Sequence, residues 1–110
     1  MEDRREIINK FIAEAKDILG ANLVRTVLYG SYVRGDFREN SDVDLMFLTT
    51  SSDEEIREQE NRLYDLAFDY EMDYGVDISV IVKSRDHFEY WLGVLPFYDS
   101  IEREGVVLHG

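Results

Sequence analysis

Three short runs of aliphatic, β-branched and aromatic residues constrain the fold of this chain more than any other feature. They span residues 23–29, 42–48 and 76–82, and each has the length and composition of a strand buried in a sheet. The segments 3–19 and 52–73 have apolar residues every three or four positions, which is the period of an amphipathic helix. Strands that alternate with helices predict an α/β or α+β fold, with a small mixed β-sheet of three to four strands flanked by helices.

Residues that start or stop helices stand at the ends of the two long helical segments. Gly20 and Gly75 follow these segments and are suited to end them, since glycine readily adopts the left-handed conformation of a helix C-cap. Ser52 or Asp53 can cap the start of the second segment through a side-chain oxygen. These signals support two helices with defined ends.

The last third of the chain predicts two shorter helices, at 85–93 and 97–104, with Pro96 between them. A small apolar tail follows at 106–108. Packing in the core is the simpler role for the large apolar side chains of this part, and a partner surface is the second. They are Phe88, Trp91, Leu92, Leu95, Phe97 and Tyr98.

The charge of the chain limits its partners. Its 110 residues include 24 acidic and 12 basic side chains, a formal net charge of −12. Such a surface repels phosphate backbones and anionic membranes, so we expect no polynucleotide and no membrane as a partner. The lack of cysteine excludes disulfides, cysteine-type zinc sites and thiol catalysis. The length predicts a single domain over 1–110, and without a signal peptide or membrane span we expect a cytoplasmic protein.

Three aspartates occupy positions where a buried strand ordinarily has apolar residues. Asp42 and Asp44 are two residues apart, so their side chains leave the same face of a strand, and Asp77 lies at the start of the next one. If these strands pair, three carboxylates meet at one end of the sheet, where repulsion raises at least one pKa. A divalent cation removes that cost, and ligands that are all oxygen favour Mg²⁺ or Mn²⁺. The alternative is a set of solvated strand ends.

Gly30 and Ser31, at the end of the first predicted strand, predict a turn that binds phosphate. Glycine permits close approach of an anion, which the backbone N–H groups and the Ser31 hydroxyl can face. Arg34 in the following loop can also reach a phosphate, although pairing with Asp36 suits it equally well. A phosphate cradle beside a metal-binding acidic cluster indicates a nucleoside triphosphate site, and therefore phosphoryl or nucleotidyl transfer.

The same residues carry a family resemblance. Gly30-Ser31, ten further residues, Asp42-x-Asp44 and a third aspartate on a later strand are similar to the signature of the nucleotidyltransferase superfamily that includes DNA polymerase beta. The stretch GSYVRGDFRENSDVDLMF and the tail SIEREGVVL resemble the minimal nucleotidyltransferase (MNT) group, and the match extends over nearly the whole chain. The resemblance implies the nucleotidyltransferase fold.

The resemblance also implies a role for each matching residue. Asp42 and Asp44 would bind two Mg²⁺ ions, while Asp77 would complete the second metal site and act as base for the acceptor hydroxyl. Gly30 and Ser31 would hold the triphosphate of ATP. MNT proteins are commonly paired with a helical HEPN ribonuclease toxin, and characterised members are antitoxins that transfer AMP from ATP to a tyrosine of the toxin. The implied function is that of an Mg-dependent protein adenylyltransferase with a HEPN toxin as its partner.

Two other functions stay open at the level of sequence. One is a non-catalytic acidic module that neutralises a basic toxin by sequestration, which the net charge of −12 favours. The other is nucleotidyl transfer to a small molecule, which the missing acceptor-binding domain disfavours. A template-directed polymerase fits the length and the charge least well.

Overall fold

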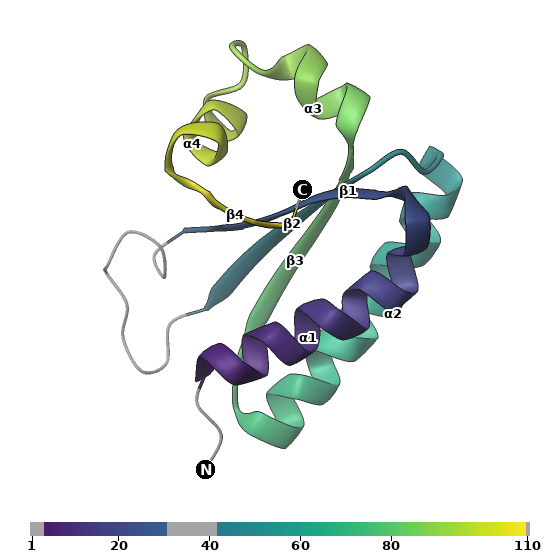
Figure 1. Cartoon of the computed structure of the whole chain (residues 1–110), viewed down its shortest axis with the longest axis vertical. Helices are drawn as coiled ribbons and strands as arrows, with labels where there is room; N and C mark the ends of the chain where they lie inside the picture. The colour runs from purple at the N-terminus through teal and green to yellow at the C-terminus, as the bar shows by residue number, and fades with distance from the viewer. Residues whose placement is uncertain (1–3, 31–41, 110) are drawn as a thin grey trace.

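The computed structural model describes residues 4–30 and 42–109 (Figure 1). In chain order its elements are α1 (Arg4–Leu19), the 3-10 turn η1 (Gly20–Asn22), β1 (Leu23–Tyr29), β2 (Val43–Thr49), α2 (Asp53–Tyr74), β3 (Ile78–Ser84), α3 (Arg85–Trp91), α4 (Pro96–Glu104) and β4 (Val106–His109).

The four described strands form one mixed sheet in the order β3-β2-β1-β4. Strand β1 runs antiparallel to both β2 and β4, whereas β2 and β3 are parallel, with α2 as the crossover between them. The predicted mixed sheet with flanking helices is therefore confirmed. The apolar tail at 106–108 supplies most of the fourth strand, which pairs with β1 at one edge of the sheet.

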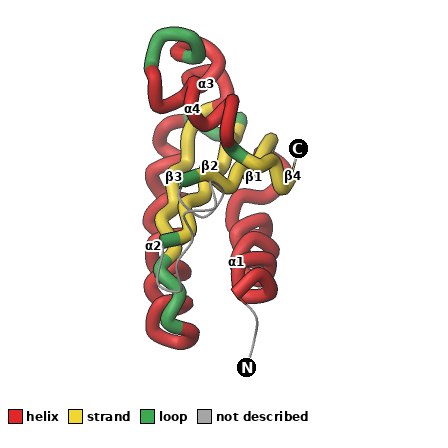
Figure 2. The backbone as a smooth tube through the Cα atoms, turned by 90° about the vertical axis from the view of Figure 1, so that its left-hand side faces the viewer, coloured by secondary structure: helices red, strands yellow, loops and turns green. Residues whose placement is uncertain are grey.

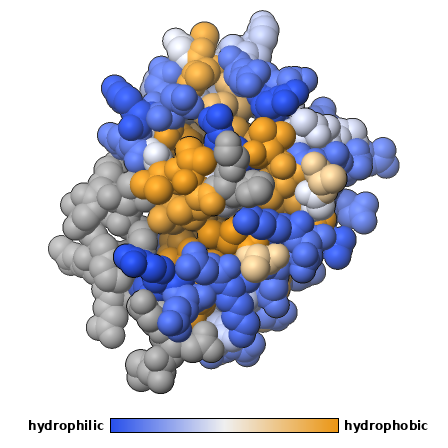
Figure 3. Space-filling model, in the orientation of Figure 1, coloured by the Kyte–Doolittle hydropathy of each residue, from blue (hydrophilic) through white to orange (hydrophobic). Residues whose placement is uncertain are grey.

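Strand β4 leaves apolar side chains at the surface. Val106, Val107 and Leu108 are exposed. In Figure 3, apolar side chains gather near the middle of the face, around the place where Figure 1 draws β4. This edge of the sheet is thus less polar than the helices around it.

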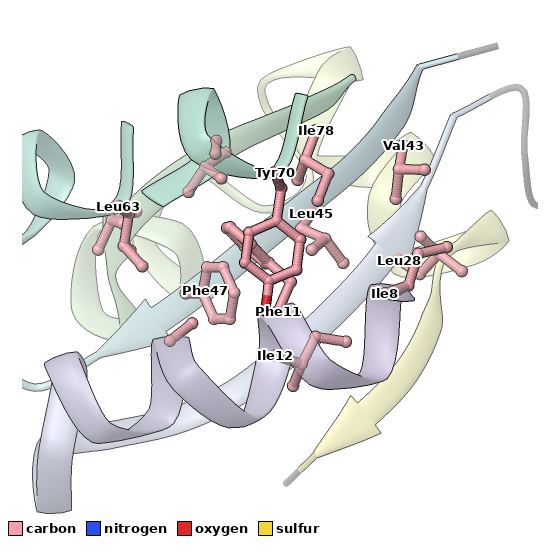
Figure 4. Packing of buried hydrophobic residues seen from close by; sticks show 14 of the residues in the cluster. Ile8, Phe11, Ile12, Leu28, Val43, Leu45, Phe47, Leu63, Tyr70 and Ile78 are labelled. Carbon is pink, nitrogen blue, oxygen red and sulfur yellow. The ribbon is translucent and has the colours of Figure 1, made fainter. Parts of the chain in front are cut away.

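Helices α1 and α2 cover one face of the sheet and form the larger core with it. Every second residue of β2, namely Val43, Leu45 and Phe47, points into this core and is completely buried. Figure 4 shows Phe11 of α1, Phe47 of β2 and Tyr70 of α2 close together. The rings of Phe11 and Tyr70 meet edge to face, with centroids 5.2 Å apart, a favourable geometry for aromatic pairs.

Helices α3 and α4 pack on the other face over a smaller cluster, and both views show them at the top of the molecule (Figures 1 and 2). The cluster consists of Val27, Met46, Leu48, Phe88, Tyr98 and Ile101. Core packing is therefore confirmed for Phe88 and Tyr98, whereas Leu95 and Phe97 are exposed. The alternation of the strands decides which residues join which core.

The capping signals of the second long helix are confirmed. Ser52 forms a capping box with Glu55, in which each side chain accepts a hydrogen bond from the other's backbone N–H. Gly75 ends α2 in the left-handed conformation, with φ of 70°. None of the helices in the described ranges has both the length and the apolar character that a membrane crossing requires.

Two strands begin later than their composition predicts. The strand expected at 42–48 starts at Val43, and the one expected at 76–82 starts at Ile78. Asp42 and Asp77 therefore precede their strands, because the parallel ladder opens where Val43 lies opposite Ile78. Carboxylates at strand entries keep access to water, which the ladder interior would deny them.

Candidate active site

The site is built where β1 ends and where β2 and β3 begin. In the antiparallel ladder Tyr29 lies opposite Asp44, and in the parallel ladder Asp44 lies beside Ser79. Paired residues point to the same face of a sheet, so these three side chains lie together on the face that also holds α3 and α4. The ladder register alone thus brings the end of β1 to the first aspartate of β2.

Gly30 is required because the side chain of Asp44 lies directly against it. A Cβ atom added to Gly30 would overlap Oδ2 of Asp44 and would lie 3.0 Å from its Cγ. The backbone of Gly30 also has φ of 83°, in the left-handed region that side chains disfavour. The glycine and the carboxylate therefore form one unit, in which backbone at the end of β1 is close to a negative charge.

Asp42 and Asp77 form a second unit. The N–H of Val43 donates a hydrogen bond of 2.9 Å to the carbonyl oxygen of Asp77, which brings the two strand entries together. Although the Asp77 side chain is largely exposed, partial desolvation raises the pKa of its carboxyl above the ordinary value. The negative charges of Asp42 and Glu71 raise that pKa further, as does a hydrogen bond between the side chains of Asp42 and Asp77. The negative charges of Asp42 and Asp77 thus lie close enough together to repel one another and to disfavour ionisation of Asp77.

The three aspartates do not form a compact three-carboxylate cluster. Within residues 4–30 and 42–109, no group of three or more His, Asp or Glu side chains is arranged to hold a metal ion. The structure instead provides two separate units, the Asp42–Asp77 pair and the Asp44 side chain that lies against Gly30. This donor set still fits Mg²⁺, which proteins usually bind through one or two carboxylates together with substrate phosphates. The repulsion within the pair is the feature that a divalent cation would relieve.

Sequence reasoning missed a hollow next to Gly30. Its volume is about 240 Å³, and it is lined by Tyr29, Gly30, Phe97, Ser100, Ile101 and Glu104. The rings of Tyr29 and Phe97 meet edge to face at 5.7 Å. Burial, and then the charge of Asp44, raise the pKa of the Tyr29 hydroxyl to about 12, so Tyr29 stays neutral. The position of Tyr29 directly before Gly30 was the signal in the sequence that could have indicated this hollow. Its other aromatic residue, Phe97, comes from α4, which is distant in sequence and could not be placed there from the sequence.

Two of the predicted nucleotide-binding residues, Ser31 and Arg34, lie outside the described residues. Their roles therefore rest on the sequence pattern alone. Gly30, Asp42, Asp44 and Asp77 are described, and all four lie at the same end of the sheet.

The comparisons with known proteins decide the family. A model of the nucleotidyltransferase domain matches residues 8–108 of the chain. The chain belongs to the nucleotidyltransferase domain family. This nucleotidyltransferase is also 32% identical over 101 residues to the putative protein adenylyltransferase MJ0141 of Methanocaldococcus jannaschii, an alignment that covers 92% of this chain and 94% of that protein.

Two solved structures share the fold of this nucleotidyltransferase. A toxin-antitoxin complex with AMP-PNP matches with a TM-score of 0.58 and 19% identity, over 92% of this chain and 72% of that one. The complex of the tri-AMPylated HEPN toxin of Shewanella oneidensis with an MNT antitoxin matches with a TM-score of 0.53 and 20% identity, over 98% and 73%. At these identities the likeness establishes the fold, and the nucleotidyltransferase fold that the motifs implied is confirmed.

Proposed function

We propose that this nucleotidyltransferase transfers AMP from ATP, with Mg²⁺, to a tyrosine hydroxyl of a HEPN ribonuclease toxin and thereby acts as its antitoxin. The family assignment supports nucleotidyl transfer, and the names of its relatives support a protein acceptor. The toxin-antitoxin complexes that share its fold support the choice of partner. We place the reaction in the cytoplasm, where ATP is available.

The observation that carries the proposal is the contact of the Asp44 carboxylate with Gly30, beside the Asp42–Asp77 pair. The missing side chain of Gly30 makes room for the Asp44 carboxylate, which supplies the negative charge that a cation needs. A strand end that was only solvated would need neither the glycine nor the repelling pair. The arrangement therefore favours a catalytic site over a set of solvated strand ends.

Each residue has a defined task in the proposed reaction. Asp42, Asp44 and Asp77 would hold Mg²⁺, which when bound neutralises the triphosphate and the developing charge. The acceptor oxygen forms a bond to the α-phosphorus, the bond to the pyrophosphate oxygen breaks, and pyrophosphate leaves. Asp77 takes the proton of the acceptor hydroxyl. Gly30 lets the Asp44 carboxylate lie against the end of β1, and its backbone would hold the triphosphate together with Ser31.

The hollow beside Gly30 suits the nucleoside part of ATP. It adjoins the phosphate turn, and the exposed ring of Phe97 and the half-buried ring of Tyr29 form one of its walls. Flat aromatic side chains stack on a purine without selecting a particular base. We assign the hollow to the nucleoside on these grounds.

A transfer assay tests the proposal directly. The chain is incubated with ATP labelled on the α-phosphate, Mg²⁺ and the protein encoded by the neighbouring gene, and the label on that protein is measured. We expect transfer by the wild type and none by the Asp42→Asn/Asp44→Asn double variant. Equal labelling by both proteins, or no labelling by either, contradicts the proposal.

Neutralisation in cells separates catalysis from sequestration. If AMP transfer is the mechanism, cells that produce the toxin survive with the wild-type chain and die with the double variant. Survival with the double variant would instead support the acidic sequestration module, which the net charge of −12 favours.

A further inference from the structure

The outward side of α2 carries a row of large apolar side chains. Tyr64, Phe68 and Met72 are four residues apart and so form one line along the helix. They are 48%, 60% and 61% exposed. The residues of α2 that are buried against the rest of the protein are different ones, namely Ile56, Leu63, Ala67 and Tyr70. Core packing therefore does not explain the row of Tyr64, Phe68 and Met72, which we call the α2 stripe.

Acidic side chains border the α2 stripe. Helix α2 contains nine acidic residues and two arginines. Asp65 and Glu71, three residues before and after Phe68, are its neighbours on the helix surface, and both are exposed. The hydroxyl of Tyr64 donates a hydrogen bond of 3.3 Å to the Glu60 carboxylate. A surface that is apolar along its middle and acidic along its sides fits a partner with an apolar seam between basic residues.

This charge pattern excludes two other occupants. A second copy of the chain would present the same acidic helix, so pairing of two α2 stripes would bring like charges together. A nucleic acid would bring its phosphates against the same carboxylates. A basic protein segment is the occupant that removes the repulsion and covers the apolar row.

The α2 stripe leads to the active site. Met72 lies in the last turn of α2, Gly75 ends the helix, and Asp77 follows at the entry of β3. Helix α2 also lies along β3, where the Glu60 carboxylate accepts a hydrogen bond of 3.4 Å from the N–H of Val82. A segment docked along the stripe therefore ends at Met72, close in the chain to Asp77 and the entry of β3.

We propose that the α2 stripe is the docking surface for the protein acceptor, which binds it through an amphipathic helix with Lys or Arg on both sides of its apolar seam. The partner's identity as acceptor rests on the proposed function, whereas docking itself requires neither nucleotide nor metal. Helices bind apolar rows through anchors at helical spacing, and large aromatic side chains supply most of the energy in such contacts. The Phe68 ring, in the middle of the stripe, is the central anchor.

A binding assay with designed peptides tests the docking surface alone. The probe is a stapled, fluorescent helical peptide with a leucine seam flanked by Lys and Arg, and its partner probe has Glu at every basic position. Binding to the full chain is followed by fluorescence anisotropy without ATP or Mg²⁺. We expect the basic probe to bind, and the Tyr64→Ser/Phe68→Ser/Met72→Ser variant to bind it at least about tenfold more weakly, since a few large anchors near the centre of an interface carry most of its binding energy.

Matched variants make each outcome decisive. Tyr90→Ser/Val94→Ser removes apolar side chains that are 74% and 63% exposed on another surface, and it should bind the basic probe as the wild type does. Equal binding by the stripe variant, equal binding of the acidic probe, or a dimer of the chain that the stripe variant abolishes overturns the proposal. Circular dichroism verifies that each variant is folded.

The two proposals can fail separately. Asp42→Asn/Asp44→Asn should bind the basic probe normally, because neither residue belongs to the α2 stripe. A chain that binds the probe through the stripe but transfers no AMP contradicts the proposed function only. A chain that transfers AMP to its partner at the same rate with and without the stripe contradicts the docking surface only.

Discussion

At the active-site end of the sheet, the two faces carry different kinds of side chains on the same strands. Along β2, Val43, Leu45 and Phe47 point toward α1 and α2 and are completely buried. Asp44 stands between them in sequence, points to the other face and is half-buried. On β1, Leu28 joins the larger core, while Tyr29 lies opposite Asp44.

This difference indicates that β2 serves stability along one face and chemistry at one end of the other. The face against α1 and α2, which we call the closed face, removes apolar surface from water and so stabilises the fold. The opposite face is also buried at Met46 and Leu48, under α3 and α4, and only its end at Asp44, which we call the open face, borders the active site. The carboxylates gathered at this end of the sheet repel one another, which favours the unfolded chain unless a cation intervenes. Substitutions on the closed face should therefore change stability, and substitutions at Asp44 should change catalysis.

Asp44→Asn should produce the largest change on the open face. The variant keeps the shape of the side chain but loses its charge, so we expect AMP transfer to fall by about 10³-fold. The free energy of unfolding should change by less than about 0.5 kcal/mol, since no buried apolar contact is lost. Initial rates with labelled ATP and urea unfolding measure the two effects. A large loss of stability together with normal AMP transfer would contradict the assignment of Asp44 to catalysis.

Phe47→Ala should produce the opposite result on the closed face. Its ring is completely buried among α1, α2 and the sheet, so its removal should cost about 3–5 kcal/mol of unfolding free energy. The folded fraction should still transfer AMP at a rate close to that of the wild type. Urea unfolding followed by circular dichroism gives the stability, and a loss below about 1 kcal/mol would mean that this face is not the main core.

Gly30→Ala should affect both properties, because Gly30 joins the end of β1 to Asp44. The added methyl group meets the Asp44 carboxylate. The alanine must also adopt a left-handed backbone conformation, at a cost of about 1–2 kcal/mol. We expect transfer to fall because the carboxylate is displaced. Gly20→Ala is the matched control: its φ is 67°, but no atom lies within 4 Å of the added Cβ. The control should lose stability and keep its activity, and equal activity of both variants would contradict the site.

Most of the secondary structure could be predicted from local sequence, because the local signals agree with one another. The second long helix has a capping serine, a regular apolar period and a terminal glycine, and it runs from Asp53 to Tyr74 as this pattern predicts. The tail at 106–108 has no such signals. It becomes a strand only because the edge of β1 is available for pairing, which is a property of the assembled sheet.

The candidate site could be predicted only in part, for a physical reason. The residue types and spacing of Gly30, Asp42, Asp44 and Asp77 are local features of the sequence. Their division into a glycine–carboxylate unit and a carboxyl pair depends on strand register, which a single sequence does not specify. The hollow between Tyr29 and Phe97 depends on how α4 packs against β1.

The smallest predicted effect lies at the start of α2, far from the chemistry of the open face. Ser52→Ala removes the hydroxyl that accepts the Glu55 N–H, so we expect a loss of about 1 kcal/mol of unfolding free energy at pH 7 and unchanged AMP transfer. Changed transfer together with unchanged stability would contradict the division between stability and chemistry.

The same cap predicts a dependence on pH. The Ser52 backbone N–H and then its hydroxyl lower the pKa of the exposed Glu55 carboxyl below 4.5. A lowered pKa means that the ionised form is favoured in the folded state, so its contribution is present above pH 4.5 and is lost as the pH falls through the folded value. Unfolding free energies of the wild type and of Glu55→Gln should therefore differ at pH 7 and converge once the pH falls below the folded-state pKa of Glu55. A difference that persists in acid, where the carboxyl group is protonated, would mean that the charge of Glu55 is not the cause.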